Sequence, residues 1–178
     1  MYANLLGDYI KGKDLSSYSE IVQKGITLHR TIDNLVDHHP AVIDLLHILY
    51  PQLPKISGIA VDLYFDHLLA KNWNAFHNSN YRNFVNDFYA HQPTCKDEFT
   101  HDFSFMLNKM KEFDWLYHYQ FIDGLKRASE GLSQRISFEN NLHEATDVFI
   151  KNEAEITKAF DLYIKDAIPF FDNYFKKT

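Results

Sequence analysis

The stretch Ile56–Trp73 reads ISGIAVDLYFDHLLAKNW, and it decides the fold class of the chain. Its apolar residues fall on nearly every side of a helix, and Asp62, Asp66 and His67 interrupt its middle. A helix that is apolar all round is buried at the centre of its domain. We therefore expect the rest of the chain to pack around this segment.

Helical spacing also dominates the flanking sequence. The chain has only 6 Gly and 5 Pro, and its apolar residues recur at spacings of three and four, whereas alternating patterns are scarce. This predicts an all-α fold of seven to nine helices in a single domain over residues 1–178. Besides the central helix, we expect helices over 1–11 (ended by Gly12), 19–38 (with Ser19 as N-cap), around 45–49, over 138–151, and from there to the C-terminus, kinked or broken at Pro169.

Composition limits the classes of function. The 178 residues suit one domain, and a single cysteine, Cys95, excludes an intramolecular disulfide. The net charge is −6 and the Lys and Arg residues are scattered, which argues against nucleic-acid binding. Because the sequence shows no apolar run of about 18 residues and no secretory signal, we expect no membrane span and a cytoplasmic location.

Aromatic residues make up 16% of the chain and recur after residue 80 at spacings that suit helices. Such a stripe is more often core than cofactor site. We therefore expect the following residues to be mostly core: Phe84, Phe88, Phe99, Phe103, Phe113, Trp115, Tyr119 and Phe121.

The charged residues of the central helix require a partner. Asp62 and Asp66 are four residues apart and share one face, and His67 lies about 100° further round. A carboxylate buried without a partner costs several kcal/mol or takes up a proton. This face must therefore meet a cation, a metal or a hydrogen-bond network.

Two other predicted helices carry polar pairs at the same spacing. His29 and Asp33 lie four residues apart with Arg30 beside them, and Asn4 and Asp8 repeat the spacing near the N-terminus. Three such pairs against an apolar background predict one shared interior site.

Two interpretations of this interior remain open. Imidazole and carboxylate groups hold Mn²⁺, Mg²⁺ or Zn²⁺, which lower the pKa of a coordinated water, and Arg30 would then bind a phosphoryl oxygen. The alternative is a buried Asp–Arg–His network that only fixes helix packing.

Three sequence motifs resemble those of one family. Residues 4–12, NLLGDYIKG, resemble its opening GNLLGDFVKG motif, and residues 29–33, HRTID, resemble its HRxID motif. Residues 62–69, DLYFDHLL, with Asn72 and Trp73 behind them, resemble a third motif, and residues 131–135 match more faintly. The chain is thus similar to the acyl carrier protein phosphodiesterases.

This resemblance implies a helical fold related to HD-type phosphohydrolases. It also implies an enzyme that needs Mn²⁺, with Mg²⁺ as a second choice, and that removes 4′-phosphopantetheine from a serine of acyl carrier protein. By the same resemblance, the metal ligands are Asp8, His29, Asp33, Asp66 and His67. Arg30 and Asn4 would contact the phosphate or support the ligands, and Asp62 would orient a ligand.

The chain departs from the family pattern in two places. Family members usually have a further segment before the first motif, with a His for which this chain has no equivalent, and some have a second His where this chain has Thr27. Two alternatives to the hydrolase follow: a metal-dependent phosphohydrolase acting on another phosphodiester or a nucleotide, and a helical module that binds the carrier without catalysis. For the acidic carrier we expect a docking surface among Lys11, Lys13, Lys71, Arg82, Lys126, Arg127 and Arg135.

Overall fold

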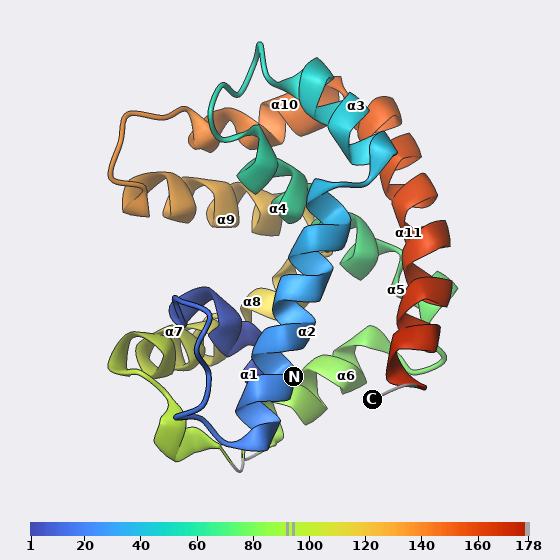
Figure 1. Cartoon of the computed structure of the whole chain (residues 1–178). Coiled ribbons are helices and arrows are strands. Elements are labelled where there is room, and N and C mark those ends of the chain that lie inside the picture. The colour runs from blue at the N-terminus through green and yellow to red at the C-terminus, as the bar shows by residue number, and fades with distance from the viewer. Residues whose placement is uncertain (92, 94, 177–178) are drawn as a thin grey trace.

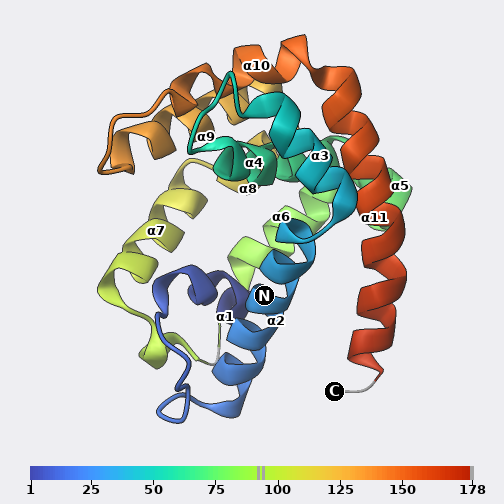
Figure 2. The ribbon, with the colours of Figure 1, turned by 45° about the horizontal axis from the view of Figure 1, so that its top comes forward.

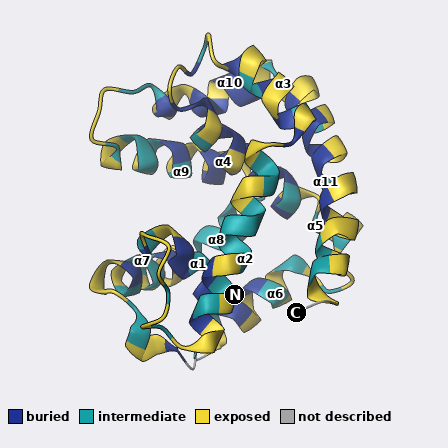
Figure 3. Ribbon diagram, viewed as in Figure 1, coloured by how far each residue is buried: buried dark blue, intermediate teal, exposed yellow. Residues whose placement is uncertain are grey.

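The central helix is α4, Ser57–Lys71, and it is buried along most of its length. In the computed structural model, which describes residues 1–91, 93 and 95–176, Val61, Tyr64 and Leu68 of α4 are almost completely buried. Figure 3 shows the buried parts of the helices in dark blue. The Tyr64 hydroxyl donates a hydrogen bond of 2.7 Å to the carbonyl oxygen of Ala145, so the one polar atom of this core side chain is satisfied.

The predicted all-α class is confirmed, and every element in the described part of the chain is a helix. This part has eleven α-helices instead of the expected seven to nine, because α1, α5 and α8 are single turns of four residues. The elements in chain order are α1 (Tyr2–Leu5), η1 (Leu6–Tyr9), α2 (Glu20–Asp37), α3 (Pro40–Leu49), α4, α5 (Trp73–Phe76), α6 (Tyr81–Ala90), η2 (Lys96–Glu98), α7 (His101–Glu112), α8 (Trp115–His118), α9 (Ile122–Arg135), η3 (Leu142–Glu144), α10 (Ala145–Lys151) and α11 (Glu153–Phe175).

The core consists of two hydrophobic clusters, and α2 passes along both of them (Figures 1 and 2). The larger cluster joins α3, α4, α9, η3, α10 and α11. The smaller one joins α1, η1, the first half of α2 and α7, and it includes the free thiol of Cys95. Leu35 and Val36, near the end of α2, pack against the larger cluster. The middle of α2 therefore lies at the junction of the two clusters.

The N-terminal and C-terminal elements differ from the sequence prediction. The helix expected over 1–11 is one α-turn followed by the 3₁₀ turn η1, although Gly12 does adopt the left-handed φ of 88° that was expected after it. The helix expected from Phe138 starts only at Leu142, because the Asn140 side chain accepts hydrogen bonds from Ser133 Oγ and the Leu142 amide and so fixes a turn. Pro169 lies inside α11 without ending it.

Ser19 does precede α2, but its side chain does not cap the helix. The Ser19 hydroxyl instead donates to Glu98 Oε1 at 2.5 Å, and this contact ties the start of α2 to η2. None of the helices in the described part of the chain combines the length and apolar character that a membrane span requires.

Candidate functional site

Five ionisable side chains gather where η1, the middle of α2 and α4 face one another. We call Asp8, His29, Asp33, Asp62 and Asp66 the acidic site. Asp8 comes from η1, His29 and Asp33 from α2, and the other two from α4. The site draws on the three segments that the sequence predicted would meet, but the expectation that it is interior is wrong, because all four carboxylates are exposed at the surface between the two hydrophobic clusters.

His29 is the centre of the contacts between η1 and α2. Its Nε2 lies 3.2 Å from Asp8 Oδ1 and 3.3 Å from Asp33 Oδ2, and its side chain is only 18% exposed, against 71% for Asp8 and 53% for Asp33. The hydrogen bond to Asp8 raises the pKa of His29, although burial opposes this shift. The imidazole therefore links two carboxylates from different elements.

Gly7 allows η1 to approach this imidazole. A Cβ at position 7 would lie 2.4 Å from His29 Cδ2 and 2.5 Å from its Cγ, well inside van der Waals contact. Gly7 is buried, so the added atom would find no open space nearby. The absence of a side chain at this position fixes how closely Asp8 comes to His29.

The two carboxylates of α4 interact electrostatically with the rest of the acidic site. Both side chains keep contact with solvent, yet protein surrounds them closely enough to weaken their hydration. This desolvation, followed by repulsion from Asp66 and Asp33, raises the pKa of Asp62 to about 7. Desolvation and the charge of Asp8 raise the pKa of Asp66 to about 6. The carboxylates therefore repel one another, and within the site only the His29 imidazole can offset their charge.

We predict that Asp62→Asn stabilises the protein when metal is removed with a chelator. Since the pKa of Asp62 is raised in the fold, the folded state binds more protons than the unfolded state between the ordinary value and about 7, and stability falls as pH rises through this window. The advantage of the variant should therefore be small at pH 4 and full at pH 8. Because Asp62 keeps contact with solvent, we expect a gain in stability at pH 8 of only about 1 kcal/mol. This gain corresponds to a rise of roughly 2–4 °C in Tm.

Thermal unfolding of both proteins at pH 4, 6 and 8 measures this difference. Asp44→Asn, at an exposed position of α3, is the matched control and should show no such dependence. A Tm difference for Asp62→Asn that shrinks as pH rises would contradict the electrostatic description of the site.

Three further residues of the sequence prediction lie outside these contacts. Arg30 uses its Nη2 to donate to the carbonyl oxygens of Gly12 (2.6 Å) and Ile10 (3.3 Å), and so holds the loop after η1. Asn4 has a buried Nδ2 with no hydrogen-bond partner among the described residues. His67 turns into the protein, where its Nδ1 donates to the carbonyl oxygen of Tyr119 at 2.7 Å and its ring packs 5.1 Å from the ring of Phe149.

The side chains of the acidic site are chemically suited to bind a divalent cation. In the described part of the chain, no Lys or Arg forms an ion pair with a carboxylate of the acidic site, so the alternative of an Asp–Arg–His packing network lacks its arginine. Carboxylate and imidazole groups of this kind bind Mn²⁺ and Mg²⁺. As the described side chains stand, no three His, Cys, Asp or Glu residues already form a coordination sphere. A cation would therefore have to replace the contacts that His29 makes with Asp8 and Asp33.

Two tyrosines near Asp66 were not expected at the site: Tyr81 was not singled out in the sequence, and Tyr119 was expected to be core. Burial and then the charge of Asp66 raise the pKa of both Tyr81 and Tyr119, which places their hydroxyls within electrostatic range of that carboxylate. The Tyr81 hydroxyl donates to the carbonyl oxygen of Leu116. Their helical spacing is the same as that of core aromatics, so it does not identify them as site residues. The only signal in the sequence is the hydroxyl group, which packing does not need, because Phe would pack equally well.

The expectation that the later aromatics are mostly core is only partly right. Phe88 and Phe103 are buried, but Phe113 and Phe121 are 55% and 44% exposed. Phe113, Trp115 and Tyr119 line a pocket of ≈330 Å³ against α9. The helical spacing of the aromatics does not distinguish these two positions, because a helix can direct its aromatic face toward a pocket as well as toward the core.

The sequence model that describes the acyl carrier protein phosphodiesterases matches residues 1–167. The chain belongs to this family. The match covers every element that contributes to the acidic site, and it extends into α11.

Several curated members of the acyl carrier protein phosphodiesterase family are similar to the chain. The protein of that name from Photorhabdus laumondii subsp. laumondii is 35% identical over 74 residues, which is 42% of this chain and 37% of that protein. The one from Pectobacterium atrosepticum is 33% identical over 41% of this chain and 38% of its own length. The one from Salmonella paratyphi A is 25% identical over 74% of this chain and 69% of its own length.

The chain thus spans less than two fifths of the length of the first two relatives. No solved structure shows a significant match to the chain.

Proposed function

We propose that the chain hydrolyses the phosphodiester that joins 4′-phosphopantetheine to a serine of acyl carrier protein. The observation that carries this proposal is the acidic site. Four carboxylates and His29 converge from three segments, without a Lys or Arg to pair them, in a chain whose named relatives are acyl carrier protein phosphodiesterases. The fold alone would not select this activity, because helical folds host many functions.

We propose that Mn²⁺ occupies the acidic site, with Mg²⁺ as the alternative. Asp8, His29, Asp33 and Asp66 would hold it; these groups have the right chemistry, His29 contacts Asp8 and Asp33 directly, and the charge of Asp8 acts on Asp66. Such a cation acts as a Lewis acid and lowers the pKa of water. It also neutralises a site that would otherwise repel a phosphodiester anion.

The residues of the chain then have distinct roles in the hydrolysis. The oxygen of a water forms a bond to phosphorus, the bond from phosphorus to the serine oxygen breaks, and the serine takes up a proton. Asp62, one turn before Asp66 on the same face, orients a ligand or a water. His67 fixes the Tyr119 backbone through its 2.7 Å hydrogen bond, so we assign it a positioning role. Arg30 holds the loop behind Asp8 in place.

Incubation of the purified protein with Mn²⁺ and holo-acyl carrier protein tests this proposal. Mass spectrometry should show conversion to the apo form and release of 4′-phosphopantetheine. Bis(p-nitrophenyl) phosphate and a cyclic nucleotide should react far more slowly, because they offer none of the contacts of the carrier. Activity on the small phosphodiesters without activity on the carrier would select a phosphohydrolase of different specificity. Binding of the carrier without any turnover would select a non-catalytic module.

A further inference from the structure

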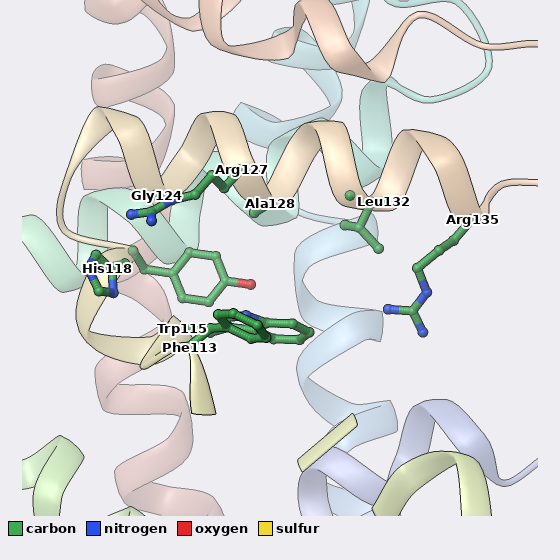
Figure 4. Close-up of a pocket in the computed structure, with 10 residues that line it drawn as sticks. Phe113, Trp115, His118, Gly124, Arg127, Ala128, Leu132 and Arg135 are labelled. Atoms are coloured by element: carbon green, nitrogen blue, oxygen red, sulfur yellow. The ribbon is translucent and has the colours of Figure 1, made fainter. Parts of the chain in front are cut away.

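The pocket that the aromatics line lies between α8 and α9. Figure 4 shows Ala128 and Leu132 on the side of α9 that faces Trp115 and Phe113, so that helix and aromatic rings form opposite walls. The walls are held closely together at one end, since a Cβ on Gly124 would lie 1.8 Å from the carbonyl oxygen of His118. A volume of ≈330 Å³ is near the lower limit for small-molecule sites, which run from about 300 to 1,000 Å³.

Tyr119 connects this pocket to the acidic site. Its side chain lines the pocket, and the charge of Asp66 contributes to the raised pKa of its hydroxyl. Its backbone carbonyl accepts the hydrogen bond from His67, the residue that follows Asp66 on α4. Tyr119 therefore lies between the pocket and the segment of α4 that carries Asp66.

The charged side chains of the pocket are arginines, which donate hydrogen bonds and accept none. Arg127 and Arg135 lie on its α9 side and are exposed, and in the described part of the chain neither pairs with a carboxylate. The Arg135 guanidinium reaches below α9 in Figure 4. No Asp or Glu is among the lining residues. The pocket thus suits a ligand with apolar groups and several acceptor oxygens, and without positive charge.

We infer that this pocket binds the pantetheine arm of the substrate. The inference rests on the proposed function, and it names the part of the substrate that the pocket takes. The arm begins with a CH₂ group on the phosphate oxygen, followed by a dimethyl-substituted carbon, and continues through amide groups, so apolar surface alternates with carbonyl acceptors. An acyl chain would match the rings of Trp115 and Phe113, but it offers no acceptor oxygen to the Tyr119 hydroxyl or the Arg135 guanidinium.

Titration with free pantetheine tests the pocket without requiring catalysis. The chain has 2 Trp, so Trp73→Phe leaves Trp115, which lines the pocket, as the only tryptophan. Saturable change of its emission with pantetheine is expected, and none with octanoate. In the same background, Ala128→Phe fills the pocket and should weaken binding about tenfold, whereas Gln134→Phe, on α9 but outside the pocket, should leave it unchanged.

With the carrier as substrate, Ala128→Phe should raise KM about tenfold and change kcat little, since it removes binding that substrate and transition state share. Pantetheine binding that is absent, or equal in the two Phe variants, would overturn the inference, and so would binding of octanoate alone. Saturable pantetheine binding in a protein that never hydrolyses the holo-carrier would reject the proposed function while supporting the pocket.

Discussion

Asp66→Asn is expected to reduce hydrolysis of holo-acyl carrier protein by at least about 100-fold. Changes to groups that merely support metal ligands already cost about 10–100-fold, and Asp66 is assigned as a ligand. The side chain keeps contact with solvent, and Asn has nearly the same shape, so the fold should survive the change. Steady-state rates at saturating Mn²⁺ measure this effect.

The same variant should lose its response to the cation. At a Mn²⁺ concentration of about 100 times Kd, binding stabilises the wild-type protein by about 2.7 kcal/mol, and a 100-fold weaker site gains under about 0.5 kcal/mol. Thermal unfolding with and without Mn²⁺ distinguishes the two proteins. Asp44→Asn on α3 is the control and should keep both the rate and the Mn²⁺ response. An active Asp66→Asn protein that Mn²⁺ still stabilises would remove Asp66 from the site.

Gly7→Ala is expected to damage both activity and stability. The new Cβ would lie 2.4 Å from His29 Cδ2 and 2.8 Å from His29 Cβ, so η1 and α2 must separate. Overpacking of this kind costs about 1–3 kcal/mol. A shift of about 1 Å in a catalytic group costs about 100-fold in rate. Chemical denaturation and steady-state kinetics measure the two effects.

The matched control is Gly58→Ala in the first turn of α4. No atom lies within 4 Å of a Cβ at that position, so the change should be neutral or stabilise by up to about 1 kcal/mol. His29→Ala removes two of the three close atoms at Gly7, and the double variant should therefore be more stable than the sum of the single effects. Wild-type activity in Gly7→Ala would show that the approach of η1 to His29 has no part in catalysis.

The sequence predicted the helical class and the central position of α4 because both depend on spacing alone. It also predicted that the i, i+4 pairs on α2 and α4 would meet, and the contact of His29 with Asp33 follows directly from that spacing. The sequence could not predict in which direction each individual side chain points. His67 follows Asp66 by one residue, yet the turn of the helix carries its ring to Phe149 and the Tyr119 carbonyl.

The role of Arg30 and the pocket depend on contacts between distant segments. Arg30 donates hydrogen bonds to carbonyl oxygens of residues about twenty positions earlier in the chain. No local sequence pattern predicts such a pairing. The pocket wall formed by Trp115 and Phe113 has the same spacing as core aromatics, and only the packing of α8 on α9 makes it a surface. Long-range packing therefore decided the features that the sequence could not predict.

Hydrolysis of holo-acyl carrier protein in ¹⁸O-labelled water tests the central claim most directly. If water attacks phosphorus at the acidic site, mass spectrometry will find one labelled oxygen in the released 4′-phosphopantetheine and an unlabelled serine in the apo-carrier. Label in the carrier, or a carrier that keeps its prosthetic group in the presence of Mn²⁺, would contradict the account.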